Sequence, residues 1–481
     1  MVKFYGIDKV KNYKIIFLAV SNWIHFGEVP FIVLFLFFFF FSLYSLLDKE
    51  RKAFWRSNIL LLLLPLINLG FFLLPPPLKM TLFRSVFYLF AFVVLVLMVI
   101  PLIRKKIQIV GEQKRIDERD IIFARFDLEE GTTRFDEYYE QRPQYRDIDQ
   151  DIRRFPDLFS PLHIQKDPFL FNLANAEFDF LEQQLNLVNG KHLPITGHFS
   201  PLIYTRMIRN TLNYLGVEVW GVCLLDQAYV YSHVGRGPES YGQEINLSHK
   251  YGIVFALEME LDMIAAAPRA PVIVETGKKY IQAAQISIIL ADFIRRMGYP
   301  ARAHIAGSNY QAIIPPLGWL AGLGELGRLG ILITDKYGPR ARLGLVTTDL
   351  PLIPDIPKTL GIQNFCYKCK KCALNCPAQA IPNGKKTEEN GVMKWALNRE
   401  QCYKWWRMAG TDCAVCIYVC PYSKSNNAFH KSIRKMINYS YIAQYLSVWG
   451  DEFFYGRYLR GVKRIFMEKK NKLFSFSLFK K

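Results

Sequence analysis

The chain has 481 residues, of which 51% are hydrophobic and 15% aromatic, and its net charge is +19. This apolar content is high for a soluble protein of this length, and it is concentrated near the N-terminus. The positive charge would suit a nucleic-acid-binding protein, but no zinc-finger or RNA-binding motif accompanies it. Composition therefore favours a membrane protein with basic flanks, with no nucleic-acid partner.

Three long uncharged segments lie near the N-terminus. They contain 37-FFFFF-41, 59-ILLLLLPLINLGFFLL-74 and 86-VFYLFAFVVLVLMVI-100. Each is long enough to cross a hydrocarbon core of roughly 30 Å as a helix, and each is apolar all round. We therefore predict a three-helix membrane anchor over residues 29–103, preceded by an N-terminal segment, residues 1–28.

The lysine and arginine residues beside the predicted spans indicate their orientation. These residues are more numerous after the first and third spans than on the opposite side, and basic loops stay in the cytoplasm. We expect no twin-arginine leader and no cleavable signal. The sequence thus predicts a multi-pass protein of the cell inner membrane, in contact with membrane lipid, whose large soluble part lies in the cytoplasm.

The soluble part is expected to have an α+β fold. Helices are predicted at Val254–Ala266 and at Tyr280–Met297, the second ending where glycine and proline follow. Strands are predicted at 331-ILIT-334 and 343-LGLVT-347, which glycine and proline flank. The predicted segments are a charged stretch, a mixed domain, a cysteine-rich domain and a basic tail, over residues 104–189, 190–360, 361–425 and 426–481.

Eight of the nine cysteines fall between Cys366 and Cys420, too close together for a disulfide framework. The first four have the spacing C-x2-C-x2-C-x3-C-P of bacterial ferredoxins, and the other four repeat it with a longer first gap. In such a motif the fourth cysteine ligates the other cluster. Zinc is disfavoured because this segment has no histidine. The predicted ligands of two [4Fe-4S] clusters are Cys366, Cys369, Cys372 and Cys420 for one, and Cys376, Cys402, Cys413 and Cys416 for the other.

The region before the cysteines contains three notable runs, 280-YIQAAQISIILADFIRRMGYPARAHIAG-307, 322-GLGELGRLGILIT-334 and 337-YGPRARLGLVTTDLPLIPD-355. Together with 117-DERDIIFARFDLEEGTTRFDEYYEQRP-143 and the cysteine motif, this region resembles the catalytic subunits of reductive dehalogenases. The resemblance covers roughly residues 115–425. The segment YGPRARLG followed by TDLPL is its most selective part.

This resemblance implies a nitroreductase-like cobalamin-binding domain joined to a two-cluster ferredoxin-like domain. It implies that the clusters reduce a base-off cobalamin to Co(I), which removes the halogen of a small organohalide so that hydrogen replaces it. The cofactor performs the difficult chemistry, and the protein supplies orientation and protons. The chain would be a membrane-anchored member of this group of oxidoreductases.

By the same resemblance, Tyr280 matches the proton-donating tyrosine and Arg342 the arginine that stabilises its phenolate, with Arg340 as the second choice. Asn309 is a weaker match for a residue that holds the halide or leaving group by its amide. A nearby guanidinium makes a phenol proton easier to give. Gly322, Gly324 and Gly327 are expected to let the backbone approach the corrinoid closely. Tyr337 is a further expected cofactor-binding residue.

Two alternatives remain open at this point. The first is an enzyme related to epoxyqueuosine reductase, which the predicted spans and Tyr280 disfavour. The second is a membrane-bound ferredoxin-type electron carrier without a substrate site, which leaves residues 190–360 without a purpose. The electron donor, a quinol or a ferredoxin, is not indicated by the sequence.

Overall fold

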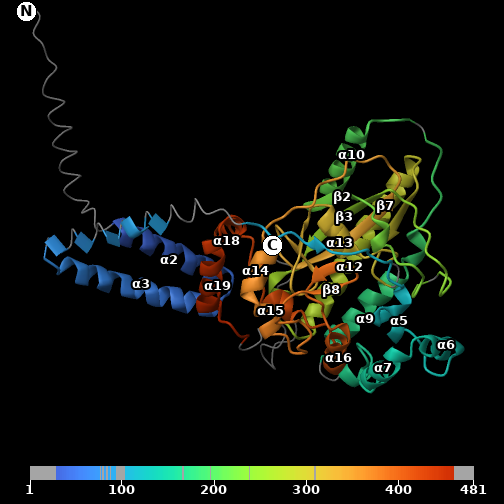
Figure 1. Cartoon of the computed structure of the whole chain (residues 1–481), viewed down its shortest axis with the longest axis horizontal. Helices are drawn as coiled ribbons and strands as arrows, with labels where there is room; N and C mark the ends of the chain where they lie inside the picture. Colours follow the sequence, from blue (N-terminus) through green and yellow to red (C-terminus); the bar gives the residue numbers. More distant parts are fainter. Residues whose placement is uncertain are drawn as a thin grey trace, which may run out of the picture. The chain divides into compact units, whose positions relative to one another are not determined.

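The computed structural model describes residues 29–75, 77–78, 81–82, 85–86, 88–90, 92–93, 103–164, 167–195, 197–237, 239–307 and 310–459. The chain divides into two compact units. We call the first the helical unit; it contains the described part of residues 1–103 together with Asn427–Arg457. The second, the mixed unit, contains Arg104–Asn426 and the described residues that follow Arg457 (Figure 1).

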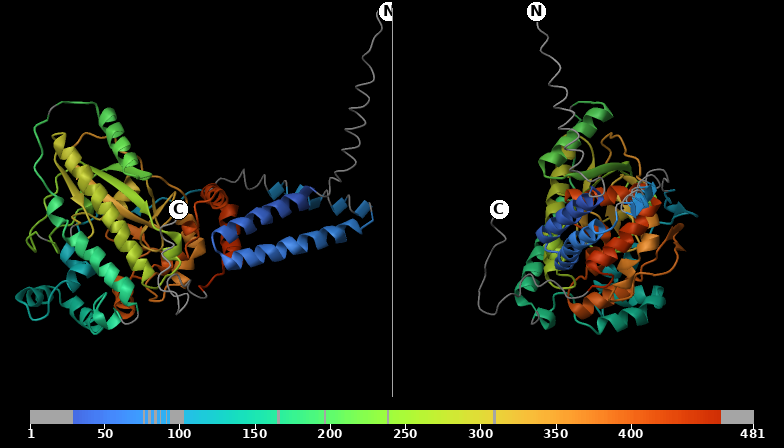
Figure 2. Two further views of the ribbon diagram at one scale, coloured as in Figure 1. Left: turned by 180° about the vertical axis from the view of Figure 1, so that it is seen from behind. Right: turned by 90° about the vertical axis from the view of Figure 1, so that its left-hand side faces the viewer.

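The helical unit is built on a hairpin of α2 (Val29–Leu47) and α3 (Arg51–Phe72), which lie side by side (Figures 1 and 2). Small residues of both helices are buried, among them Ser42 and Ser45 of α2 and Ala53 and Ser57 of α3. Small side chains let helices approach closely. Asn58 of α3 donates a hydrogen bond of 2.8 Å to the Ser42 hydroxyl of α2. The last helices among the described residues, α18 (Ala428–Tyr439) and α19 (Tyr441–Tyr455), belong to this unit.

The outward surfaces of the hairpin are apolar. Leu62 and Leu66 of α3 are 73% and 64% exposed. Among the described residues, one helix, Arg51–Gly70, has the length and composition to cross a membrane, and α2 has a shorter apolar stretch, Phe31–Leu47. The third predicted span lies mostly outside the described residues, so the prediction of three spans stays a prediction.

The mixed unit is centred on an antiparallel sheet in the order β2-β3-β7-β4. The strands are β2 (Val219–Leu224), β3 (Tyr251–Glu258), β7 (Ala341–Thr348) and β4 (Ala301–His304). The helix predicted at Val254–Ala266 is wrong for residues 254–258, which belong to β3, and is confirmed only for the short helix Leu261–Ile264. This strand is buried on both faces, so its sequence lacks the alternation that distinguishes a strand from a buried helix.

Two hydrophobic cores lie on the two faces of this sheet. Ile253 and Phe255 of β3 pack with α12 (Pro271–Arg296), whereas Val254 and Ala256 pack with α13 (Ile314–Leu320). Successive residues of a strand point to opposite faces, which explains the division. Cys223, the cysteine outside the clustered eight, is buried in the second core and packs as a small apolar residue.

Helix α12 is longer than predicted. The expected end before Gly298 is confirmed, since this glycine has φ +96°, but the helix starts at Pro271. Tyr280 therefore lies well inside the helix rather than at its start. The predicted strands near 331–334 and 343–347 are confirmed as β6 (Leu332–Thr334), which pairs with β5 (Gly324–Leu326), and as part of β7.

The remaining elements surround this centre (Figure 1). A small sheet is formed by β1 (Gln108–Ile109), β9 (Val392–Lys394) and β8 (Thr387–Glu389). The other helices are α5 (Ile122–Phe126), α6 (Thr133–Gln141), α7 (Arg146–Arg153), α8 (Pro161–Ile164), α9 (Pro168–Glu182), α10 (Pro201–Tyr214), α11 (Leu261–Ile264), α14 (Ile362–Cys369), α15 (Lys371–Leu374), α16 (Arg399–Ala409) and α17 (Val415–Tyr418).

Candidate functional site

The two cysteine motifs share one local backbone geometry. Lys370, directly after Cys369, has φ +54°, and Ala414, directly after Cys413, has φ +48°. Each left-handed residue is followed by a helix of four residues, α15 or α17, and these two helices pack against each other. Residues other than glycine adopt this conformation at a cost of about 1–2 kcal/mol. Its repetition at equivalent positions indicates one loop design used twice, as the sequence repeat predicts.

The thiols fall into two groups. Burial is the main cause that raises the pKa of the Cys420 thiol well above its ordinary value. The nearby thiols of Cys366, Cys369 and Cys372 raise it further. In the same way, burial raises the pKa of Cys416, and the thiols of Cys413, Cys402 and Cys376 add to it. In each group, the last cysteine of one motif lies with three cysteines of the other motif, as predicted for the cluster ligands. We call Cys366, Cys369, Cys372 and Cys420 the first cysteine set, and Cys376, Cys402, Cys413 and Cys416 the second cysteine set.

Thiolates that lie close together repel one another unless cations such as iron bind them. A set of four thiolates has the number of ligands that a [4Fe-4S] cluster requires. Within the described ranges, no three His, Cys, Asp or Glu side chains converge as ligands of one single metal ion.

A buried arginine supports the first cysteine set. Arg328 is fully buried, its Nε donates to the carbonyl oxygen of Cys366 at 3.1 Å, and its guanidinium lies 4.4 Å from the ring centroid of Trp395. Lys386 lies 4.8 Å from the same ring. Burial raises the pKa of the Cys366 thiol to about 11, and Arg328 works against this rise. Arg328 could not be singled out from the sequence, because its contacts depend on the tertiary fold.

Glu325 fixes the helix that leads into the first motif. Its side chain is 1% exposed, and a carboxylate oxygen accepts a hydrogen bond of 2.7 Å from the backbone N–H of Ile362, the first residue of α14. Burial raises the pKa of Glu325 to about 7, although this backbone bond opposes the rise. The carboxyl group thus satisfies one of the unpaired N–H groups at a helix start.

Tyr280 and Arg342 lie together between α12 and β7. The Arg342 guanidinium is 5.2 Å from the ring centroid of Tyr280. Its Nη2 donates to the Thr276 hydroxyl at 2.7 Å and pairs with Asp412 Oδ2 at 3.2 Å, and the Thr276 hydroxyl also donates to Asp412 at 2.9 Å. Thr276 is one helical turn before Tyr280, on the same side of α12. Asp412 directly precedes Cys413. This network, which we call the Tyr280 network, therefore joins the tyrosine to the loop of the second cysteine set.

The Tyr280 network is charged and enclosed. Burial lowers the pKa of the Arg342 guanidinium, but Tyr280 and Asp412 more than offset this, so its pKa is raised. Burial raises the pKa of Asp412, and Arg342 opposes that rise. The Nε of Arg342 is buried without a hydrogen-bond partner in the described part of the chain. Nearly all buried donors in folded proteins have a partner, so this nitrogen is an unusual donor in the Tyr280 network.

Thr276 and Asp412 were missed by the sequence analysis. The available signals were their positions, four residues before Tyr280 and one before Cys413. Two other predicted residues, Asn309 and Arg340, are not part of the observed network. Asn309 lies outside the described residues. Arg340, the second choice for the arginine, is directed elsewhere: it pairs with Glu258 at 2.6 Å and donates to the carbonyl oxygens of Met259 and Ser423.

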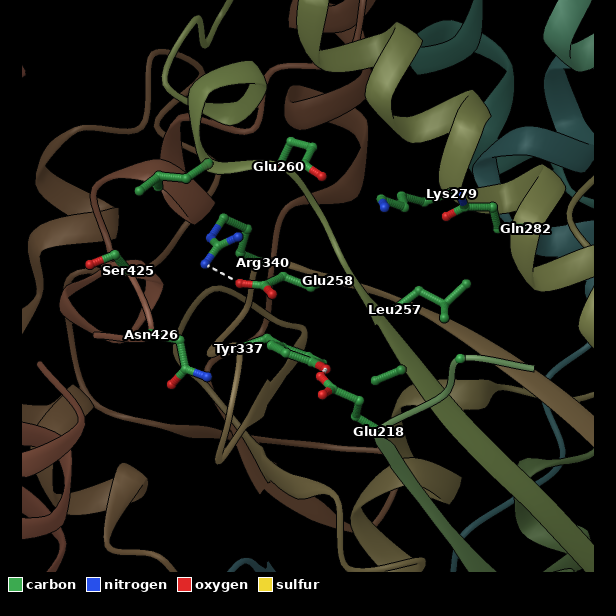
Figure 3. Close-up of a pocket in the computed structure, with 13 residues that line it drawn as sticks. Glu218, Leu257, Glu258, Glu260, Lys279, Gln282, Tyr337, Arg340, Ser425 and Asn426 are labelled. Atoms are coloured by element: carbon green, nitrogen blue, oxygen red, sulfur yellow. Dashed lines mark hydrogen bonds and ion pairs between the residues drawn. The ribbon is translucent and has the colours of Figure 1, made fainter. Parts of the chain in front are cut away.

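Tyr337 lines a cavity of about 390 Å³ in the mixed unit (Figure 3). Its hydroxyl donates to a Glu218 carboxylate oxygen at 2.7 Å. Lys279 and Gln282 of α12 line the cavity as well, so the helix that carries Tyr280 also forms part of this wall. The walls include carboxylate, ammonium, guanidinium and amide side chains, so the cavity offers both donors and acceptors of hydrogen bonds.

The three predicted glycines serve internal packing. A Cβ on Gly322 would meet the carbonyl oxygen of Ile356, and one on Gly324 or Gly327 would meet Ile333 of β6. Gly322 also has φ +72°. The close approach that the structure shows at these glycines is between protein segments. Their predicted approach to a corrinoid stays a prediction.

The fold and the two cysteine sets define a protein with a mixed α/β domain joined to a domain for two four-iron clusters. Residues 365–424 match the family model of the 4Fe-4S dicluster domain. The chain is 31% identical over 314 residues to a tetrachloroethene reductive dehalogenase of Dehalobacter restrictus, covering 56% of this chain and 55% of that one. It is 29% identical over 272 residues to a tetrachloroethene reductive dehalogenase of Sulfurospirillum multivorans, covering 50% and 54%.

The fold agrees with these sequence matches. A solved catabolic reductive dehalogenase superposes with a TM-score of 0.60 and 23% identity, covering 74% of this chain and 50% of that one. The resemblance to reductive dehalogenases is thus confirmed in sequence and in fold, as is the prediction of a dicluster domain. The chain spans about half the length of the curated relatives it matches.

Proposed function

We propose that this protein is a membrane-anchored reductive dehalogenase that uses a corrinoid and two [4Fe-4S] clusters to replace a halogen of a small organohalide by hydrogen. The observation that carries the proposal is the Tyr280 network, which places a phenol and a guanidinium beside the loop of a predicted cluster ligand, Cys413. The net reaction consumes two electrons and one proton and releases a halide ion.

The two cysteine sets would hold the clusters, and the second would be nearer to the reacting centre. Arg342 is within electrostatic range of Cys416, and Asp412 links it to the loop that begins at Cys413. A corrinoid, when bound, supplies the strongly reducing metal centre that this reaction requires. The residues that would hold it include those lining the cavity at Tyr337, beside Lys279 and Gln282.

Tyr280 would give its hydroxyl proton to the carbon that loses the halogen. Arg342 would stabilise the phenolate that results, because a cation close to the ring favours the charged form. Thr276 and Asp412 hold Arg342 by two polar contacts, so the guanidinium would not have to reorient during the reaction. Asn309 stays our candidate for binding the leaving halide.

The membrane anchor belongs to the same proposal. The apolar surface of the α2–α3 hairpin supports it, and so do the uncharged segments of the sequence. With three spans and the basic residues that flank them, the mixed unit would lie in the cytoplasm. Electrons would then come from a quinol in the membrane or from a ferredoxin.

Halide release by the full chain tests this function. The protein is prepared anaerobically with its corrinoid, supplied with reduced methyl viologen, and given chlorinated or brominated alkenes and phenols. We expect release of one halide ion per two electrons consumed. A chain that holds iron and corrinoid but releases no halide from any of these compounds would contradict the proposal and favour a reductase related to the epoxyqueuosine enzymes. A chain with iron alone would favour an electron carrier.

A further inference from the structure

The C-terminal helices α18 and α19 pack on the hairpin of the helical unit although the whole mixed unit separates them in sequence. Phe41 of α2 is 2% exposed, because its ring is covered by Phe429 of α18 at 4.9 Å and by Phe454 of α19 at 4.6 Å between centroids. Arg56 of α3 lies 5.6 Å from the ring of Phe453. Such aromatic contacts bury large areas and fix the helices in place.

Polar contacts anchor α18 and α19 at the turn between α2 and α3. Asn427, the residue that caps α18, donates to Asp48 Oδ2 at 3.0 Å, and the His430 ring lies 3.8 Å from the same carboxylate. The other ring nitrogen of His430 is 2.8 Å from the Tyr455 hydroxyl, at the end of α19. The C-terminal helices are therefore tied to one end of the hairpin.

One side of α19 exposes aromatic rings at a spacing of four residues. These are Tyr441, Tyr445, Trp449 and Phe453, with exposed fractions of 46%, 51%, 65% and 38%. Residues four apart share a helix face, and here they touch: the first two rings are 5.2 Å apart, and the last two stack at 5.5 Å. We call this the α19 aromatic face. The opposite side of the helix, with Ala443 and Gln444, is buried.

The position of this face relative to the hairpin indicates what covers it. The α2–α3 turn carries five consecutive charged residues, 48-DKERK-52, which must stay outside the hydrocarbon core. Because α18 and α19 are tied to this turn, they lie at the depth of the lipid headgroups if the hairpin enters a membrane. Tyrosine and tryptophan are enriched at that depth, where an apolar ring and a polar group are both accommodated. The exposed Lys431 and Lys435 of α18 add positive charge that suits anionic headgroups.

We propose that the α19 aromatic face lies in the headgroup layer of the membrane, so that the C-terminal helices form part of the membrane anchor. This inference rests on the proposed membrane insertion of the α2–α3 hairpin, but not on the dehalogenation chemistry. It gives the chain a lipid-binding element after the cysteine-rich domain as well as before the mixed unit.

Depth-dependent fluorescence quenching tests the proposal. The full chain is inserted into vesicles of phosphatidylcholine and phosphatidylglycerol that carry bromine either close to the headgroup or close to the chain end. The emission of Trp449 is obtained by subtracting the spectrum of Trp449→Phe from that of the unchanged protein. Trp220→Phe, a substitution in the mixed unit, provides a matched difference spectrum that controls for non-specific effects of bromine.

We expect the Trp449 emission to fall at least about twofold with shallow bromine and much less with deep bromine, because an interfacial ring sits near the headgroups. Emission that neither bromine position quenches would overturn the proposal, since the face would then be in water or covered by a second copy or another protein. Equal quenching by both would also overturn it, because a ring deep in the core is not interfacial. Vesicle flotation of the same samples measures whether the chain is bound to the membrane, and so identifies a failure of the hairpin to insert. Halide release measures the proposed chemistry independently.

Discussion

The two cysteine sets have the same loops but different surroundings. In the loops, Lys370 and Ala414 share one left-handed conformation, and each precedes a four-residue helix. Around the first set lie a fully buried Arg328 and a buried Glu325. Beside the second set lies Asp412, which connects to Arg342. The comparison shows that the loops position the cysteine ligands in the same way in both sets. The neighbouring side chains differ, and they would determine the reduction potential and the role of each cluster.

Under the proposed function, this difference would give the two predicted clusters an order. Positive charge beside a cluster stabilises its reduced form, so Arg328 would make the first cluster easier to reduce. The second cluster is the one connected to the Tyr280 network, and it would deliver electrons to the reacting centre. Substitutions on one side should therefore leave the properties of the other side unchanged.

The largest effect is expected from Tyr280→Phe, which removes the proposed proton donor next to the second set. Halide release should fall by roughly 10²–10⁴-fold, the range typical of general acid catalysis, while the iron and corrinoid contents stay the same. Steady-state assays with reduced methyl viologen measure this. Tyr299→Phe is the matched control, since this tyrosine lies in the core against Tyr204 (3.0 Å between hydroxyls) and should keep its activity. Unchanged turnover in Tyr280→Phe would remove the tyrosine from the mechanism.

Glu325→Gln tests the side of the first set through the pH dependence of stability. A carboxyl group whose pKa is raised by folding binds its proton more tightly in the folded state, so its contribution is present below pH 4.5 and is lost as the pH rises through about 7. This loss is on the order of 3 kcal/mol. Thermal unfolding of the unchanged protein should therefore occur at lower temperature at pH 7.5 than at pH 5, and Glu325→Gln should weaken that dependence. The same dependence in both proteins would contradict the assignment.

Asp412→Asn probes the connection between the second set and Arg342. Asparagine keeps the shape and one acceptor but loses the charge, so Arg342 should be held less firmly beside Tyr280. We expect kcat to fall about tenfold with little change in KM, a loss of about 1.4 kcal/mol that affects the transition state. Glu239→Gln, which neutralises the partner of the buried Arg302 at 2.8 Å, is the control. An equal loss in the control would show that any buried ion pair gives this effect.

Arg328→Gln should produce the smallest effect. Removing the buried cation beside Cys366 should lower the reduction potential of the first cluster by on the order of 50 mV, equivalent to about 1 kcal/mol, and leave the second unchanged. Redox titration followed by electron paramagnetic resonance distinguishes the two clusters. Arg302→Gln removes a buried arginine that pairs with Glu239 instead, and should shift neither potential. If both potentials moved together in Arg328→Gln, the two surroundings would not act separately.

The sequence was most informative where chemistry restricts spacing. The cysteine motif predicted the dicluster domain and the crossed grouping, because only a few spacings allow thiolates to reach a cubane. The end of α12 followed from Gly298, whose positive φ a glycine tolerates best. Strand β3 was mistaken for a helix since a strand buried on both faces has no alternating pattern.

Residues that act through tertiary contacts could not be found in this way. Thr276, Arg342 and Asp412 come from three distant segments, and only the fold brings them together. The resemblance to known dehalogenases supplied Tyr280 and Arg342, but not the two residues that hold the arginine. For the glycines at 322, 324 and 327, the fold shows a requirement that the sequence could not reveal, since a Cβ there would meet other protein segments.

The most direct test of the account is the metal content of the full chain, purified anaerobically from a host that makes corrinoids. Two four-iron clusters and one corrinoid predict about eight iron atoms and about one cobalt atom per chain. In a Cys413→Ala variant, iron should fall toward about four per chain as the second cluster is lost, while the first remains. Iron without cobalt, or about two zinc atoms in place of iron, would contradict the account.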